Sequence, residues 1–424
     1  MKKLIQHVAL YQDHGVLEGQ NIAIDGSRIT GFPEAPKASD YDEVIDGKGM
    51  LALPGFVNTH NHVAMTVFRS YADDMQLMDW LEKKIWPAEA KLTDDVIYAQ
   101  SMLGIAEMIR CGTTAYADMY DHMDQEARAV EESGIRACLC RGSIGIGPNA
   151  QAGLDENRQL FLDWHGKADG RIMVMMGPHA PYTCPPDYLH KFVDQARELG
   201  AEIHIHLSET QGEVENIKQQ YGKSPIALMD EIGVLDCGCL AAHCVWVDDD
   251  DMDIMAAKHV RVAHNPGSNL KLASGIAPKM LAKGITVGLG TDGASSNNNL
   301  DIVEEMRLTT LIHKANTLDP LVIPAETAIN MLTEGGAKCL GYKDVGKLET
   351  GYKADITLVD REGLHWYPKN DTLSLMAYSA NSMDVDTVLV NGEVLLRHKE
   401  FTKLDIEKIK AEAERTRKKL FAHI

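Results

Sequence analysis

The chain has 424 residues, of which 45% are hydrophobic and 25% are charged, and its formal net charge at pH 7 is −20. This composition is typical of a folded globular protein, and the length predicts two or three domains or one large barrel with an appendage. Because the negative charge repels phosphate backbones and anionic lipid surfaces, we expect neither a nucleic-acid nor a membrane partner.

The sequence begins with β-prone runs at residues 8–10 and 21–24 and then alternates short apolar strands with longer helical segments. Helices are predicted at residues 94–110, 186–199, 224–232 and 248–258. Strands are predicted at residues 51–57, 113–118, 135–139, 172–176, 202–207, 240–242, 260–263 and 286–289. These alternations favour a (β/α)₈ barrel. A doubly wound open sheet is the alternative, but no Gly-x-Gly-x-x-Gly follows the first strand.

The β-rich pattern returns near the C-terminus, with a predicted strand at 354–359, a hairpin at 387–396 and a surface helix at 404–421. We therefore predict an α/β chain in which a (β/α)₈ TIM-type barrel is joined to a small β-sandwich domain built from both chain ends. The predicted bounds are 56–349 for the barrel, and 1–55 with 350–424 for the small domain.

The sequence shows no targeting or membrane segment. Polar residues interrupt the apolar start of the chain, and no uninterrupted apolar run reaches the roughly 18 residues that span a bilayer. The eight cysteines are scattered, and the close pairs Cys138/Cys140 and Cys237/Cys239 lack C-x-x-C spacing, which favours free thiols in a reducing compartment. We expect a cytoplasmic protein, and we leave open whether it forms a homo-oligomer.

Two predicted barrel strands have a pair of histidines with the same spacing, one pair after the strand at 51–57 and the other within the strand at 202–207. His60 and His62 lie two residues apart, so both imidazoles can face one ion. His204 and His206 repeat this spacing, and periodicity alone does not choose between them. His206 is nearer the strand end, where barrel active sites lie, so we predict it as the ligand and His204 as a packed core residue. Glu209, just beyond, is either a solvated loop residue or a proton-transfer group beside the metal.

Three further strands end in His243, His264 and Asp292. Taken alone, Asp292 could equally be a turn residue or a helix N-cap. Together, five of the eight predicted strands end in His or Asp. Three imidazoles and one carboxylate suit Zn²⁺ or Fe²⁺ better than Mg²⁺ or Ca²⁺. No lysine in the strand before Gly177 offers a carbamate bridge between two metals, so we expect one divalent ion, zinc, with ferrous iron as the alternative.

The segments around these residues resemble the amidohydrolase superfamily, and within it the 5-methylthioadenosine/S-adenosylhomocysteine deaminases. The matching segments are PGFVNTHNH at 54–62, DWL at 79–81, IWPAEA at 85–90, GPHAPY at 177–182, HIHLSET at 204–210, TDGASSN at 291–297 and GYKAD at 351–355. The block at 79–90 is similar to the deaminase branch in particular. The resemblance covers nearly the whole chain and implies hydrolytic deamination of an adenine nucleoside to an inosine-type product and ammonia.

The resemblance also implies a role for each residue of the metal centre. The implied metal ligands are His60, His62, His206 and Asp292. Glu209 would protonate the ring nitrogen beside the carbon under attack, His243 would orient and stabilise the attacking hydroxide, and Asp292 would take the proton of the water. His264 is expected to support the site structurally.

The implied substrate is 5′-methylthioadenosine or S-adenosylhomocysteine, with adenosine as a further substrate. The residues implied to contact it are Glu89, Arg141, His179, Glu209 and Asp292. Glu89 would accept hydrogen bonds from both ribose hydroxyls. Some relatives carry a second arginine for the homocysteine carboxylate, but the loop at 142–153 has none. Arg158 is then the candidate, and use of S-adenosylhomocysteine is less secure than use of the other two nucleosides.

Two other kinds of function fit parts of the pattern. The metal frame is shared with s-triazine chlorohydrolases and aminohydrolases and with guanine and cytosine deaminases, so the frame alone does not separate these reactions. A non-catalytic barrel scaffold would be expected to lack some of the ligands, and none is missing here.

Overall fold

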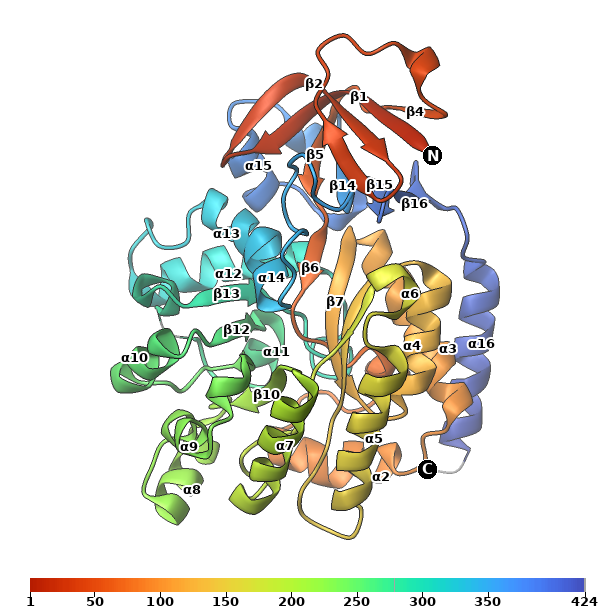
Figure 1. Cartoon of the computed structure of the whole chain (residues 1–424). Helices are drawn as coiled ribbons and strands as arrows, with labels where there is room; N and C mark the ends of the chain where they lie inside the picture. The colour runs from red at the N-terminus through yellow and green to blue at the C-terminus, as the bar shows by residue number, and fades with distance from the viewer. Residues whose placement is uncertain (278, 423–424) are drawn as a thin grey trace.

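The computed structural model describes residues 1–277 and 279–422, and a barrel of parallel strands lies at its centre (Figure 1). The strands pair in the orders β6-β7-β8-β9 and β10-β11-β12-β13. Their bounds are β6 (Phe56–Asn58), β7 (Thr113–Tyr120), β8 (Arg136–Arg141), β9 (Ile172–Val174), β10 (Ile203–Leu207), β11 (Cys239–His243), β12 (Arg261–His264) and β13 (Thr286–Leu289). Every residue of β7, β10 and β11 is buried, as expected for parallel strands covered on both faces.

The two groups of strands join at two seams. At the first seam, Met176 forms a parallel bridge with Ile203. At the second seam, the Thr59 N–H donates to the Leu289 carbonyl at 2.7 Å. The strands therefore form a ring without a free edge, which confirms the predicted TIM-type barrel and excludes the doubly wound open sheet.

Helices cover the outside of the barrel, and α3 and α7 have the bounds that the sequence predicts. The covering helices are α3 (Asp94–Arg110), α4 (Met123–Ser133), α5 (Ala150–Trp164), α7 (Pro186–Leu199), α8 (Gln211–Tyr221), α9 (Pro225–Ile232), α10 (Asp249–Ala257), α11 (Pro266–Lys271), α12 (Ile302–Thr317), α13 (Ala325–Leu332) and α14 (Glu334–Cys339). Local signals set their ends. Asp248 and Asp251 form a capping box at the start of α10, and Gly200 ends α7 with φ +66°.

Strands from both chain ends form one nine-stranded sheet, seen at the top of Figure 1. Its order is β17-β16-β15-β14-β5-β1-β2-β3, with β4 paired to β1. The bounds are β1 (Lys2–Gln12), β2 (Gly15–Asp25), β3 (Arg28–Gly31), β4 (Glu43–Asp46), β5 (Met50–Pro54), β14 (Ile356–Asp360), β15 (Val385–Val390), β16 (Glu393–Arg397) and β17 (Glu400–Phe401). The predicted hairpin lies in β15 and β16, and the predicted C-terminal helix is α16 (Ile406–Phe421), which lies along α3.

The prediction of one strand at residues 51–57 was wrong, because the chain changes sheets at Gly55. The Gly55 N–H donates to Asp355 next to β14, whereas the Phe56 N–H donates to Gly112 next to β7. A Cβ at Gly55 would lie 2.1 Å from Thr114 Oγ1, so no larger residue fits at this crossing without displacing its neighbours.

Within the described residues, no helix combines the length and apolarity needed to cross a bilayer.

A buried ion pair connects the barrel to the nine-stranded sheet. Arg136, at the start of β8, donates from Nε and Nη2 to the two carboxylate oxygens of Asp355 at 2.8 and 3.1 Å. The exposed fractions of the two side chains are 2% and 0%. The Asn391 side chain accepts a further bond from Arg136 at 2.7 Å, and its backbone N–H donates to Asp355. Both carboxylate oxygens and the guanidinium thus have hydrogen-bond partners away from water.

We predict that Asp355→Ala destabilises the protein by about 3–5 kcal/mol, because it leaves the Arg136 guanidinium buried and unpaired. Denaturant or thermal unfolding of the variant would measure the loss. As a control, Lys410→Ala removes a pair with Glu407 on the exposed face of α16 and should leave the unfolding midpoint unchanged. Equal midpoints for the two variants would contradict the proposed importance of the buried pair.

Candidate metal centre and active site

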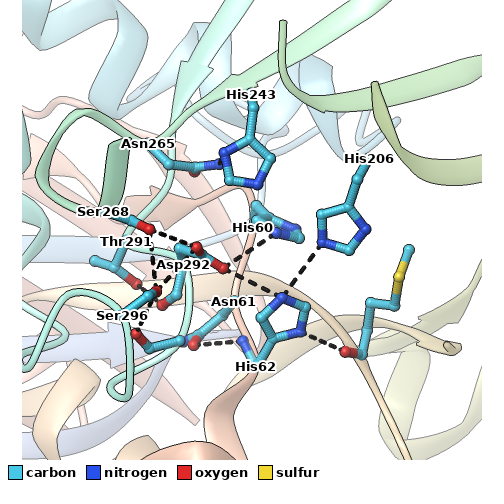
Figure 2. A network of polar contacts seen from close by, with 12 residues as sticks. His60, Asn61, His62, His206, His243, Asn265, Ser268, Thr291, Asp292 and Ser296 are labelled. Carbon is cyan, nitrogen blue, oxygen red and sulfur yellow. Dashed lines mark hydrogen bonds and ion pairs between the residues drawn. The ribbon is translucent and has the colours of Figure 1, made fainter. Parts of the chain in front are cut away.

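Four side chains from three separate segments meet at the carboxyl end of the barrel (Figure 2). His60 and His62 follow β6, His206 lies in β10, and Asp292 follows β13. Asp292 Oδ1 lies 3.4 Å from His60 Nε2 and 3.2 Å from His62 Nε2. The Nε2 atoms of His62 and His206 lie 3.4 Å apart. The structure therefore brings together the four residues that the resemblance implies as ligands.

Backbone carbonyls orient two of these imidazoles. His62 Nδ1 lies 2.6 Å from the Met119 carbonyl, and His206 Nδ1 lies 2.7 Å from the His179 carbonyl. Since a carbonyl only accepts, each Nδ1 carries the proton, and each Nε2 directs its lone pair into the cluster. A hydrogen bond of this kind on the far nitrogen is typical of a metal-bound histidine.

His60 is oriented by another histidine. Its Nδ1 lies 3.0 Å from His204 Nε2, so His204 is a buried supporting residue, as predicted. His60 Nε2 is buried without a hydrogen-bond partner. Burial lowers the pKa of His60 to about 3, which keeps the ring neutral, as a metal ligand must be.

The donor set fits a divalent metal ion. Among the described residues, two overlapping groups have ligand atoms within 4.8 Å of one another, namely His60, His62 and His206, and His60, His243 and Asp292. The Nε2 lone pairs of the histidines and the carboxylate of Asp292 face one another across a buried space. These electron-rich groups repel one another unless a cation lies between them. Imidazole nitrogens and a carboxylate oxygen at this separation match the chemistry of a divalent transition-metal site.

Asp292 is held in place by two hydroxyls. Its Oδ2 accepts from Ser268 at 2.7 Å and from Ser296 at 3.0 Å, which leaves Oδ1 facing the histidines. The backbone of Asp292 has φ +58°, a conformation uncommon for residues other than glycine, although aspartate adopts it more often than most. Burial raises its pKa, but the contacts with His60 and His62 lower it further, so the pKa lies well below the usual value.

Glu209 and His243 lie beside this cluster. Burial, with a smaller effect from the Asp292 charge, raises the pKa of Glu209 to about 8, so its carboxyl carries a proton at neutral pH. His243 Nδ1 lies 2.9 Å from the Asn269 amide nitrogen and 3.3 Å from that of Asn265. Both amide nitrogens donate, so in this arrangement His243 bears its proton on Nε2, which lies 3.9 Å from Glu209 Oε2.

A cavity opens over the cluster. Its polar wall consists of His62, Glu89, Tyr120, Asp121, His179, Tyr182, His206, Glu209, His243, Asp292 and Ser296. Its apolar wall consists of Met65, Leu77, Trp80, Leu81, Ile85, Trp86, Met119, Ile144 and Leu272. Much of the apolar wall comes from α1 (Leu77–Trp80), the π-helical turn η3 (Leu81–Ile85) and α2 (Trp86–Glu89). The cavity therefore suits a ligand that has both an apolar part and polar groups.

Glu89 also lines this cavity. The Tyr120 hydroxyl donates to its Oε1 at 2.7 Å, which leaves Oε2 for a ligand. Burial raises the pKa of Glu89 to about 7, and the bond from Tyr120 limits that rise. His179 also lines the cavity, with Nδ1 bonded to Thr183 Oγ1 at 2.8 Å.

The two arginines singled out in the sequence lie outside the cavity wall. Arg141 forms ion pairs with Asp121 and Glu156, so its charge is already balanced on both sides. Arg158 lies on α5, where it is exposed and paired with Glu198. In this structure, neither guanidinium is presented to a ligand in the cavity.

Three residues that support the site escaped the sequence analysis. Tyr120 lies two residues beyond the strand predicted at 113–118, and a longer strand would have placed it near the site. Ser296 lies inside the segment already compared with the family, whereas Ser268 carries no local signal. His264, expected to be structural, does not line the cavity, and its Nε2 lies 3.2 Å from His313 Nε2.

A parallel α/β barrel with a histidine–aspartate cluster at the carboxyl ends of its strands defines the class of metal-dependent barrel enzymes. Comparison with known proteins narrows this class. Residues 51–395 match the model of the amidohydrolase family. The chain belongs to the amidohydrolase family, as the sequence motifs predicted.

Relatives match the chain over nearly its whole length. It is 51% identical over 417 residues to a protein of Dictyoglomus turgidum named 5-methylthioadenosine/S-adenosylhomocysteine deaminase, covering 98% of each chain. A protein of Pelotomaculum thermopropionicum with the same name is 52% identical, covering 95% of this chain and 94% of its own.

Two solved structures are also similar. A zinc-bound adenosine deaminase from Xanthomonas campestris superposes with a TM-score of 0.93 at 30% identity, covering 99% of this chain and 98% of the other. A zinc complex of atrazine chlorohydrolase from Arthrobacter aurescens TC1 has a TM-score of 0.91 at 26% identity, covering 98% and 100%.

We predict that the protein binds one divalent ion per chain once a chelator has removed any metal and the ion is added back. Titration calorimetry and elemental analysis would measure this stoichiometry. His206→Ala should remove stoichiometric binding because it deletes one inward Nε2. His190→Ala, at an exposed position on α7, is the matched control and should bind as the wild type does. Full occupancy in the His206 variant would show that the ion is held elsewhere.

Proposed function

We propose that this protein is a metal-dependent hydrolase that deaminates adenine nucleosides to inosine-type products and ammonia. The names of its relatives support this reaction. The observation that carries the proposal is one cavity that joins a metal-binding cluster, a buried protonated carboxyl at Glu209 and a second carboxyl at Glu89. The proposed substrates are 5′-methylthioadenosine and adenosine, with S-adenosylhomocysteine as a weaker candidate.

The proposed metal ligands are His60, His62, His206 and Asp292. Zinc is the proposed ion, with ferrous iron as the alternative, because imidazole nitrogen and carboxylate oxygen suit both. When bound, such an ion acts as a Lewis acid and makes hydroxide available from water near pH ~7.

Three residues would then move or hold protons. Asp292, whose low pKa keeps it ionised, would accept a proton from the attacking water. Glu209 would donate its proton to the ring nitrogen next to the amino-bearing carbon, where negative charge builds up. His243 would donate from Nε2 to the attacking oxygen and so orient it. Loss of ammonia from the tetrahedral carbon leaves the carbonyl of the inosine-type product.

The substrate contacts are proposed from the cavity wall. Glu89, positioned by Tyr120, would accept from the ribose hydroxyls, and His179 would contact the base or sugar. Arg141 lies outside the cavity wall, so it would act on the substrate indirectly, through its ion-pair partner Asp121, which lines the cavity. In the absence of a free guanidinium in the described cavity wall, an uncharged 5′ substituent is the better fit to the apolar side.

We also propose that residues 1–55 and 350–424 form a small β-sandwich domain beside a barrel of residues 56–349. A cytoplasmic location is supported by the eight free cysteines, all of which lie in the described residues.

The test of the proposal is a spectrophotometric deamination assay with adenosine, 5′-methylthioadenosine and S-adenosylhomocysteine. We expect turnover by the wild type, fastest with the first two. Glu209→Gln should lower kcat by about 10²–10⁴-fold with the metal retained, because Gln has no acidic proton to donate. Wild-type inactivity on all three nucleosides would overturn the proposed reaction, and an active Gln variant would overturn the role of Glu209.

Glu89→Ala tests the ribose contact. We predict that kcat/KM for 5′-methylthioadenosine falls by roughly 10–100-fold, the effect of lost hydrogen bonds to a charged group, while the rate with free adenine is unchanged. Glu82→Ala, exposed on η3 in the same segment, is the control and should change neither rate. Equal losses for the nucleoside and the free base would contradict a ribose contact.

A further inference from the structure

The turn that carries Glu209 has an unusual backbone. It connects β10 to α8, and Ser208 has φ +51°, in the left-handed region that non-glycine residues seldom adopt. Ser208 and Glu209 are 0% and 5% exposed, so their backbone N–H groups need partners inside the protein. The surroundings must therefore hold this turn in place.

Glu213, on the first turn of α8, supplies both partners. Its Oε1 accepts from the Ser208 N–H at 2.8 Å, and its Oε2 accepts from the Glu209 N–H at 2.9 Å. The residue is 5% exposed. Each oxygen thus binds one of two successive N–H groups, which restrains the peptide that carries Glu209.

This contact differs from an ordinary helix cap. Thr210 is the N-cap of α8, and its hydroxyl accepts from the Glu213 N–H at 3.1 Å. In a capping box, the glutamate at this position would bond back to the N–H of the N-cap residue itself. Here the carboxylate reaches past Thr210 to the two residues before it. The sequence T-x-x-E is therefore used to shape the turn before the helix.

The other side of the turn is also fixed. The Ser208 carbonyl accepts from the Trp246 N–H at 2.8 Å, which joins the turn to the segment after β11. His243, the last residue of β11, lies just before this segment, and its Nε2 is 3.9 Å from Glu209 Oε2. Glu213 and Trp246 thus hold the backbone from opposite sides, and the Glu209 carboxyl is left facing the cavity.

We propose that Glu213 is a positioning residue for the proton transfer by Glu209, an inference that rests on the proposed function. Glu213 is not among the residues that line the cavity. Its part is to keep the Glu209 carboxyl within reach of the ring nitrogen, since a displacement of about 1 Å at a reacting group can cost roughly 10²-fold in rate. Burial raises the pKa of Glu213 to about 7, and the two N–H donors limit that rise.

The test is a kinetic comparison of Glu213→Gln with two other variants. Glutamine has nearly the same shape but only one acceptor, so its NH₂ would face a backbone N–H. We expect kcat to fall roughly 10²-fold, while KM and metal content stay close to wild type. Glu215→Gln is the matched control, since Glu215 lies on the same helix, exposed and bonded to Gln211, and this change should have no effect. An unchanged kcat in folded Glu213→Gln would overturn the proposal.

A double-mutant cycle separates positioning from a general structural role. In the Glu209→Gln background, the second change Glu213→Gln should lower kcat little further, because the proton transfer it serves is already gone. The same fold loss in both backgrounds would overturn the proposal.

Glu213→Asp keeps both carboxylate acceptors and should therefore retain more activity than Glu213→Gln. An Asp variant no more active than the Gln variant would also count against the positioning role.

Hydrogen exchange gives a readout that does not depend on activity. Peptides covering residues 203–214 should exchange faster in Glu213→Gln than in the wild type, whereas Glu215→Gln should not change them. Unchanged protection would overturn the positioning contact. Absence of wild-type turnover on any nucleoside, with the exchange difference present, would instead place the failure in the proposed reaction.

Discussion

The site depends on the closure of the barrel between its first and last strands. The Asp292 N–H donates to the His60 carbonyl at 3.0 Å, next to the bond from Thr59 to Leu289. This seam brings the carboxylate against the two histidines that follow β6, although the segments lie far apart in the sequence. Because a parallel barrel directs the carboxyl ends of all its strands to one face, His206 arrives at the same place from β10.

Burial then sets the chemistry of what the barrel brings together. The same desolvation keeps His60 neutral and Glu209 protonated, since it disfavours the charged form of each group. Asp292 stays ionised because its contacts with His60 and His62 outweigh the effect of burial on its pKa, while two hydroxyls hold its other oxygen. One buried space thus holds a neutral imidazole, an ionised carboxylate and a protonated carboxyl, and burial together with the contacts of each group sets its charge.

The supporting residues matter as much as the groups that face the cavity. Besides lining the cavity, Met119 offers the backbone carbonyl that determines which nitrogen of His62 carries the proton. Glu213 contributes only acceptors for two N–H groups, yet it shapes the turn that presents Glu209. Such residues are hard to recognise from sequence because a backbone carbonyl or a helix-start glutamate occurs at many positions without this effect.

Local pattern was sufficient to predict the barrel, its helices α3 and α7, and the histidines and aspartate at the strand ends, because strand length and side-chain alternation are properties of neighbouring residues. Only the tertiary structure decided three other features. They are the change of sheet at Gly55, the pairing of Arg141 with Asp121 and Glu156, and the serines that hold Asp292. These depend on contacts between distant segments, whose geometry no short stretch of sequence encodes.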